Sequence, residues 1–77
     1  MENGQQMHGD NVVMANTSGA TKLNISNVGE SNFIVYGIST SSSKLLVNEI
    51  GNYSGTVVNG SYIMFIVQSE GDWTINW

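Results

Sequence analysis

The sequence has no cysteine and no proline, and its only histidine is His8. Small domains usually compensate for a small core with disulfides or a bound metal ion, and this chain lacks the residues for either. A chain of 77 residues buries only about 60% of the surface that its unfolded form exposes, so its margin of stability is thin. We therefore expect a single domain that is helped by self-association or by a flanking domain.

Charge is also scarce. Charged residues make up 10% of the chain, and Lys22 and Lys44 are the only basic ones against six acidic ones. Phosphate neutralisation needs clustered lysine and arginine, so the net charge of -4 argues against nucleic acid and anionic membranes as partners. The longest apolar run, residues 62–67, is too short to span a bilayer, which predicts no membrane insertion. Residues 1–10 have no basic start and no apolar run, so we expect no signal peptide within this chain.

Asparagine, serine, threonine, glycine and glutamine take the place of charged residues. This composition is typical of secreted β modules and surface assemblies, which predicts an extracellular or cell-surface location. Four Asn-x-Ser triplets fit the pattern for N-glycosylation, at Asn16, Asn24, Asn52 and Asn59. In a chain so rich in asparagine and serine, we interpret these triplets as a consequence of composition.

The hydrophobic pattern is that of an all-β protein. Short runs rich in valine, isoleucine, tyrosine and phenylalanine alternate with clusters of glycine, asparagine and serine, and no stretch has helical periodicity. The predicted strands cover residues 11–15, 21–26, 32–39, 44–50, 54–58, 61–69 and 72–77. This spacing predicts a single antiparallel β-sandwich, jelly-roll or immunoglobulin-like, over residues 11–77, preceded by a polar and mobile segment, 1–10.

Turn signals and alternation add detail. Asn59-Gly60 is the strongest signal for a tight type I′ hairpin, and Glu70-Gly71 predicts a second tight turn. Two alternating faces are expected to meet in the core: Ile63, Phe65 and Val67 on one strand, and Trp73, Ile75 and Trp77 on the next. The strand at 32–39 is apolar on both sides, with Phe33 and Val35 on one side and Ile34, Tyr36 and Ile38 on the other. Such a strand is central in a sheet or contributes an association face.

Three segments in this order carry a family likeness: SNFIVYGI (31–38), LLVNEIGNYSG (45–55) and GSYIMFIVQSEGDWTINW (60–77). Together they resemble a small, poorly characterised β-sandwich accessory domain of secreted or envelope-anchored bacterial and archaeal proteins. The resemblance covers residues 31–77. It implies an accessory module without known catalysis, of a kind sometimes compared with carbohydrate-binding or prepeptidase domains.

The segment 45–55 raises the question of a binding loop. Asn48, Glu49 and Tyr53 gather where the chain turns at Gly51, and they could form a shallow site for a carbohydrate or an ion. A structural corner explains the same residues, if the Tyr53 hydroxyl and the Asn48 amide bond to neighbouring backbone groups. We expect the structural corner.

The candidates for catalysis and for metal binding are few. His8 is the only histidine and lies in the polar lead segment, away from any predicted strand that could present a serine or threonine nucleophile. Glu70 and Asp72 flank Gly71 in a solvated turn, where they suit neither acid-base chemistry nor a calcium site with three clustered oxygens. The glycines follow no phosphate-binding pattern. We therefore expect no enzyme, cofactor or metal.

The sequence leads to two hypotheses about function. The first is a non-enzymatic extracellular accessory or binding module, whose ligand the sequence does not identify. The second is a self-assembling structural subunit of an appendage, filament or capsid, which low charge and the two-sided strand at 32–39 favour. The expected partners are a second copy or a flanking domain, through Ile34, Tyr36 and Ile38 or through an edge strand, with carbohydrate as the alternative ligand.

Overall fold

The computed structural model describes all 77 residues and contains eight strands and no helix. The strands are β1 (Met7–His8), β2 (Asn11–Met14), β3 (Lys22–Val28), β4 (Asn32–Ile38), β5 (Ser43–Ile50), β6 (Tyr53–Val58), β7 (Met64–Gln68) and β8 (Asp72–Asn76). They form two four-stranded sheets, sheet 1 with the order β1-β8-β3-β6 and sheet 2 with the order β2-β7-β4-β5. All strand pairs are antiparallel, which confirms the predicted sandwich.

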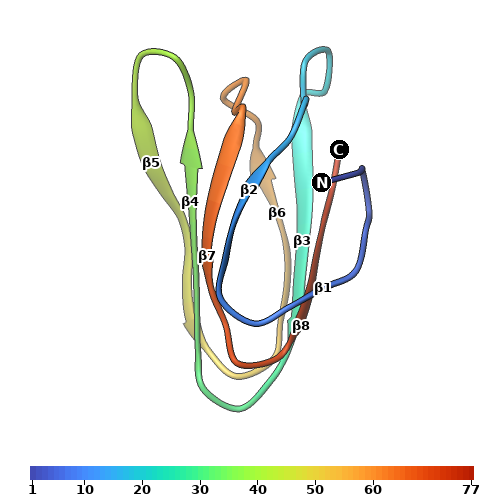
Figure 1. Ribbon diagram of the computed structural model, residues 1–77, viewed down its shortest axis with the longest axis vertical. Coiled ribbons are helices and arrows are strands. Elements are labelled where there is room, and N and C mark those ends of the chain that lie inside the picture. Colours follow the sequence, from blue (N-terminus) through green and yellow to red (C-terminus); the bar gives the residue numbers. More distant parts are fainter.

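The pairing of the strands identifies the type of sandwich. Antiparallel ladders join β1 to β8, β2 to β7, β3 to β6 and β4 to β5. One long antiparallel hairpin, with its turn between β4 and β5, would contain these same four pairs. When such a hairpin is rolled up so that its strands divide between two sheets, the result is a jelly roll, which is the arrangement seen here (Figure 1). An immunoglobulin-like sandwich has another strand order. The structure has no helix that is long and apolar enough to cross a membrane.

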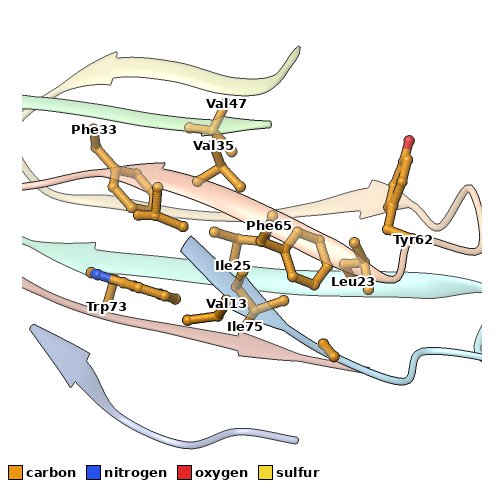
Figure 2. Close-up of a cluster of buried hydrophobic side chains, with 12 residues drawn as sticks. Val13, Leu23, Ile25, Phe33, Val35, Val47, Tyr62, Phe65, Trp73 and Ile75 are labelled. Carbon is orange, nitrogen blue, oxygen red and sulfur yellow. The ribbon is translucent and has the colours of Figure 1, made fainter. Parts of the chain in front are cut away.

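The core lies between the two sheets, where alternate residues of each strand point inward (Figure 2). Phe65 and Val67 of sheet 2 lie on the inner face opposite Trp73 and Ile75 of sheet 1, as the alternation predicts, and all four are buried. The buried cluster consists of Val13, Ala15, Leu23, Ile25, Phe33, Val35, Val47, Tyr62, Phe65, Val67, Trp73 and Ile75. Trp77 is only partly buried and packs against the edge of this cluster.

The prediction of a type I′ hairpin at Asn59-Gly60 is wrong. The strands on either side, β6 and β7, belong to different sheets and do not pair. Neither residue has a positive φ, and Ser61 is the only non-glycine residue that does. The Asn59 side chain instead donates to the carbonyl oxygens of Thr17 and Ala20, at 3.0 Å each. Asn59 therefore ties this crossing to the β2–β3 connection.

The strand predicted at 61–69 begins only at Met64. The alternation breaks before it, because Tyr62 and Phe65 both point inward although they are three residues apart, while Ile63 is exposed. The Tyr62 ring packs edge-on against Phe65, with 6.0 Å between ring centroids, and closes this end of the core. Tyr62 thus takes the place in the core that alternation assigned to Ile63.

Residues 1–10 are not the free segment that the sequence suggested. β1 pairs with β8, so that Met7 lies opposite Trp73, and Met1 and Met7 pack against the core. Asn3 and Trp77 exchange two hydrogen bonds through the Asn3 amide and the Trp77 backbone, which holds the two chain ends together (Figure 1). The Trp73 indole N–H donates to the Gly9 carbonyl oxygen at 2.9 Å. These contacts attach the segment to sheet 1.

We predict that Trp73→Ala destabilises the domain by about 3–5 kcal/mol, since it removes the largest fully buried side chain and the partner of the Gly9 carbonyl oxygen. Urea unfolding followed by circular dichroism measures the change. The control is Val28→Ala in the neighbouring strand β3, where the side chain is exposed and a change within about 0.5 kcal/mol is expected. A loss below about 1 kcal/mol for Trp73→Ala would show that the indole does not support the core.

Candidate interaction surface

The three residues singled out at the corner point in different directions. Asn48 is exposed on the outer face of β5, and Glu49 is exposed at the rim of the sandwich. The Tyr53 ring is half-buried, covers Gly55 and lies 6.0 Å from the Phe33 ring. No hydrogen bond of the structure involves the Asn48 amide or the Tyr53 hydroxyl, so the bonds expected of them are absent. The three side chains do not converge on one site.

Other asparagines hold this corner. The buried Asn27 side chain donates to the Gly51 carbonyl oxygen at 3.1 Å, and the Asn52 side chain accepts from the Gly29 N–H at 3.0 Å. Asn27 also accepts a 2.8 Å hydrogen bond from the Ser69 hydroxyl. Sequence reasoning missed Asn27, although an asparagine at an inward position of an alternating strand is a signal for a buried polar contact. The corner is therefore a structural joint between β3, β5 and the β7–β8 connection.

The titratable side chains form one close pair. His8 Nδ1 lies 2.7 Å from Asp72 Oδ1, and both side chains are largely exposed. On the same outer surface of sheet 1, the hydroxyls of Ser26 and Thr74 form a hydrogen bond with each other at 2.7 Å. Neither hydroxyl is hydrogen-bonded to His8. No three side chains of the metal-binding types lie close enough to hold an ion together. This pair joins β1 to β8 at the surface.

The outer face of sheet 2 is apolar across all four strands. Tyr36 of β4 lies between Ile66 of β7 and Leu45 of β5, and Ile66 lies next to Val12 of β2. These four side chains are between 40% (Ile66) and 60% (Val12) exposed. We define the apolar outer face by the outward-pointing apolar residues of the sheet, Val12, Met14, Ile34, Tyr36, Ile38, Leu45, Ile50, Met64 and Ile66. No charged side chain points outward from this sheet.

The apolar outer face includes the association face expected from the sequence. Ile34, Tyr36 and Ile38 share one side of β4, which is a central strand of sheet 2. The remaining members come from β2, β5 and β7, and no reasoning about a single strand brings them to the same place. A signal was present, because the segments NVVM and MFIVQ are apolar on both sides, as 32–39 is. Whether a partner covers this face stays a prediction.

The outer face of sheet 1 has the opposite character. Its central positions carry asparagine, serine and threonine, namely Asn24, Ser26, Ser54, Thr56, Thr74 and Asn76. These side chains bond across strands, as when the Thr56 hydroxyl donates to Asn24 Oδ1 at 2.7 Å. A shallow hollow opens over β3 and β6 there, and no aromatic ring lines it. This polar outer face suits exposure to water.

The four sheet edges differ in protection. β1 and β2 are edges of only two and four residues. β5 has a bulge where Leu45 and Leu46 lie opposite Tyr36, and it carries Lys44 and Glu49 on the inward side of its edge, both exposed. Bulges and inward-pointing charges are devices that prevent sheets from pairing edge to edge. The edge of β6, with the sequence YSGTVV, has none of them.

Charge is also separated along the length of the molecule. The β1–β2, β3–β4, β5–β6 and β7–β8 connections gather at one end (Figure 1), and five of the six acidic residues lie in or next to them. These are Asp10, Glu30, Glu49, Glu70 and Asp72. Both lysines lie at the other end, Lys22 at the start of β3 and Lys44 next to the start of β5. The molecule therefore has an acidic end and a lysine end.

No protein-family model matches the chain, and neither the curated proteins nor the solved structures contain a significant match to it. The likeness of residues 31–77 to accessory domains of secreted proteins stays a prediction. Jelly rolls serve as lectins, cupins and capsid subunits, so the fold selects none of these functions.

We predict that Lys44→Thr with Glu49→Thr makes the protein prone to aggregate, because it removes both inward charges from the edge of β5 without changing the net charge. Light scattering during mild heating measures the effect. Lys22→Thr with Glu30→Thr removes the same charges away from any sheet edge, and it should behave like the unmodified chain. Equal scattering from both double variants would contradict a protective role of Lys44 and Glu49.

Proposed function

We propose that this chain is a non-enzymatic binding module of a secreted or cell-surface protein, and that it binds through the apolar outer face of sheet 2. The observation that carries the proposal is the contrast between the two outer surfaces. The middle of one sheet presents aliphatic side chains and a tyrosine to the outside, with polar residues toward its ends. The middle of the other presents asparagine, serine and threonine, with Val28 and Val58 at its margins. Both sheets contribute buried residues to the core, so folding alone does not account for the difference.

Exposed apolar patches that extend over several strands are rare on monomeric proteins and usually mark surfaces that bind a partner. Here the patch lies on a regular sheet, so its backbone is rigid and its shape exists before binding. Preformed surfaces lose little conformational entropy when they bind. A patch without charged side chains also avoids the cost of removing a charge from water. These properties favour a protein surface of similar character as the ligand.

The secreted or cell-surface setting rests on composition. The polar outer face is rich in asparagine, serine and threonine, as the whole chain is. The hydroxyls of Ser26 and Thr74 and the Asn24 amide oxygen are engaged in hydrogen bonds within the sheet. This argues against a reactive serine or threonine there, and it supports the non-enzymatic part of the proposal.

We predict that the isolated chain binds the uncharged dye Nile red on the apolar outer face. Ile66→Thr should lower the dye fluorescence at least about twofold, because it interrupts the apolar row at its middle. Its matched control is Thr74→Ile, which adds the same apolar side chain to the polar outer face and should not lower the fluorescence. If, at concentrations where the chain is monomeric, Ile66→Thr leaves the fluorescence unchanged or the chain does not bind the dye, the proposed binding surface is wrong.

The second candidate function is a self-assembling structural subunit, which the unprotected edge of β6 favours. An edge strand without charge, proline or bulge can pair with the same edge of another copy and extend the sheet. Because each copy has one such edge, pairing two β6 strands would give a closed pair, and longer assemblies would need a further contact.

We predict that, if β6 pairs between copies, Thr56→Lys abolishes the pairing by placing a charge on the edge strand. Asn24→Lys is the matched control, since it breaks the same Thr56–Asn24 hydrogen bond from the central strand β3. Sedimentation velocity at several concentrations measures the association. If both variants associate as the unmodified chain does, β6 is not the contact.

A further inference from the structure

We propose that the apolar outer face is covered by the same face of a second copy, in a symmetric dimer whose two-fold axis runs across the strands. This inference rests on the proposed function, because it names the partner and the orientation for the same surface. Three properties of the molecule favour this dimer, namely the absence of charge on this face, its size, and the separation of charge along the molecule.

The apolar outer face is suited to contact with itself. In a two-fold symmetric dimer each copy contributes the same patch, so the apolar side chains of one copy meet those of the other. The outward polar residues of the sheet lie toward its two ends, namely Asn32, Asn48 and Gln68 at one end and Ser43 at the other. The outward side of sheet 2 has no charged residue, and stacking two such sheets leaves no unpaired charge buried. Sheets of this kind pack about 10 Å apart with their side chains interdigitated.

The dimensions of the molecule set an upper limit on the contact. A side face of a molecule that measures 32 × 21 × 19 Å has a flat footprint of at most roughly 600 Å². Two copies in face-to-face contact would therefore bury up to roughly 1,200 Å², which is the lower end of the range for stable interfaces. The apolar outer face spans all four strands of its sheet, from Val12 on one edge strand to Leu45 on the other. A dimer of modest affinity is expected.

Charge selects the orientation. If the two-fold axis ran along the strands, the acidic ends of both copies would coincide, and Glu49 near the end of β5 would lie over the start of β2 of the other copy, where Asp10 is. If the axis runs across the strands, the acidic end of each copy lies beside the lysine end of the other. The strand β5 then lies over β5 of the partner, with Lys44 at the end that Glu49 occupies in the partner. Both side chains point away from the contact and form no pair across it, so the preference comes from placing ends of opposite charge side by side, in place of two acidic ends.

The orientation predicts which residues meet. We place the axis near the row formed by Tyr36, Ile66 and Leu45. A residue that precedes this row along its strand then lies over the residue of the partner that follows the row by the same distance. On β5, Ser43 and Asn48 both point outward and lie on opposite sides of Leu45. Ser43 should therefore lie over Asn48 of the partner subunit. With the axis along the strands, Ser43 would instead lie over the partner's Met14 at the end of β2.

The first experiment is sedimentation equilibrium over a wide range of concentrations. The 8.3 kDa chain should show a monomer–dimer equilibrium. Tyr36→Glu should raise its dissociation constant at least about 100-fold, because it places a charge in the middle of the contact. Ser54→Glu adds the same charge to the polar outer face, and it should change the constant less than about threefold. Circular dichroism melts verify that both variants fold.

The second experiment uses the absence of cysteine from the chain, which makes single-cysteine labelling specific. A short bismaleimide cross-linker should join Ser43→Cys to Asn48→Cys in an equimolar mixture of the two variants. It should not join Ser43→Cys to Met14→Cys, and Thr56→Cys on the polar outer face should not cross-link with any of them.

The outcomes separate this inference from the proposed function. A chain that is monomeric at all concentrations, but binds Nile red through the apolar outer face, rejects the dimer and leaves the binding surface for a different protein or a flanking domain. A monomer that does not bind the dye rejects both. A dimer that Ser54→Glu dissociates and Tyr36→Glu does not rejects this interface. Cross-linking of Ser43→Cys with Met14→Cys in place of Asn48→Cys rejects the orientation.

Discussion

The contact between the inner faces of the two sheets is the interaction on which the rest of this structure depends. The chain has no disulfide, and no group of its side chains is placed to hold a metal ion, so closing the sheets on each other is its one large source of stability. Trp73 links this contact to the outer parts of the molecule, because its ring is buried and its N–H holds the Gly9 carbonyl oxygen. The crossing of the chain from β1 to β2, and with it one edge of each sheet, is therefore attached to the core.

The ends of the sandwich follow from the same constraint. Where the chain crosses from one sheet to the other, its polar groups next to the core need hydrogen-bond partners. The structure meets this requirement, because no buried polar side-chain atom lacks a partner. Asn27 and Ser69 do this at the acidic end, and Thr17 and Asn59 at the lysine end. Short polar side chains suit these places, because they reach nearby carbonyl oxygens without occupying core volume. The abundance of asparagine and serine thus has a structural use at the crossings, besides keeping the surface polar.

The outer faces are not constrained by the core, and there the two sheets differ. Folding requires only that one residue in two points inward, so the outward residues are free to serve another purpose. At the centre of sheet 1 they are hydrophilic and bond to each other, as Ser26 and Thr74 do, whereas at the centre of sheet 2 they form the apolar outer face. Such a face lowers solubility unless it is covered. The charges on the edge of β5 limit uncontrolled pairing, which is consistent with a surface meant for one specific contact.

The sequence by itself determined the fold class, seven of the eight strands within a few residues, and the main inward-facing residues, because alternation over four to eight residues is a local property. It also determined that Ile34, Tyr36 and Ile38 share one side of a strand. Only the tertiary structure decided which strands are neighbours. The Asn59-Gly60 signal for a hairpin was overridden because β6 and β7 belong to different sheets, and Met7 pairs with Trp73 across almost the whole chain. The apolar outer face combines residues from Val12 to Ile66, and their contact arises from pairing between strands that are distant in the sequence, which local patterns do not encode.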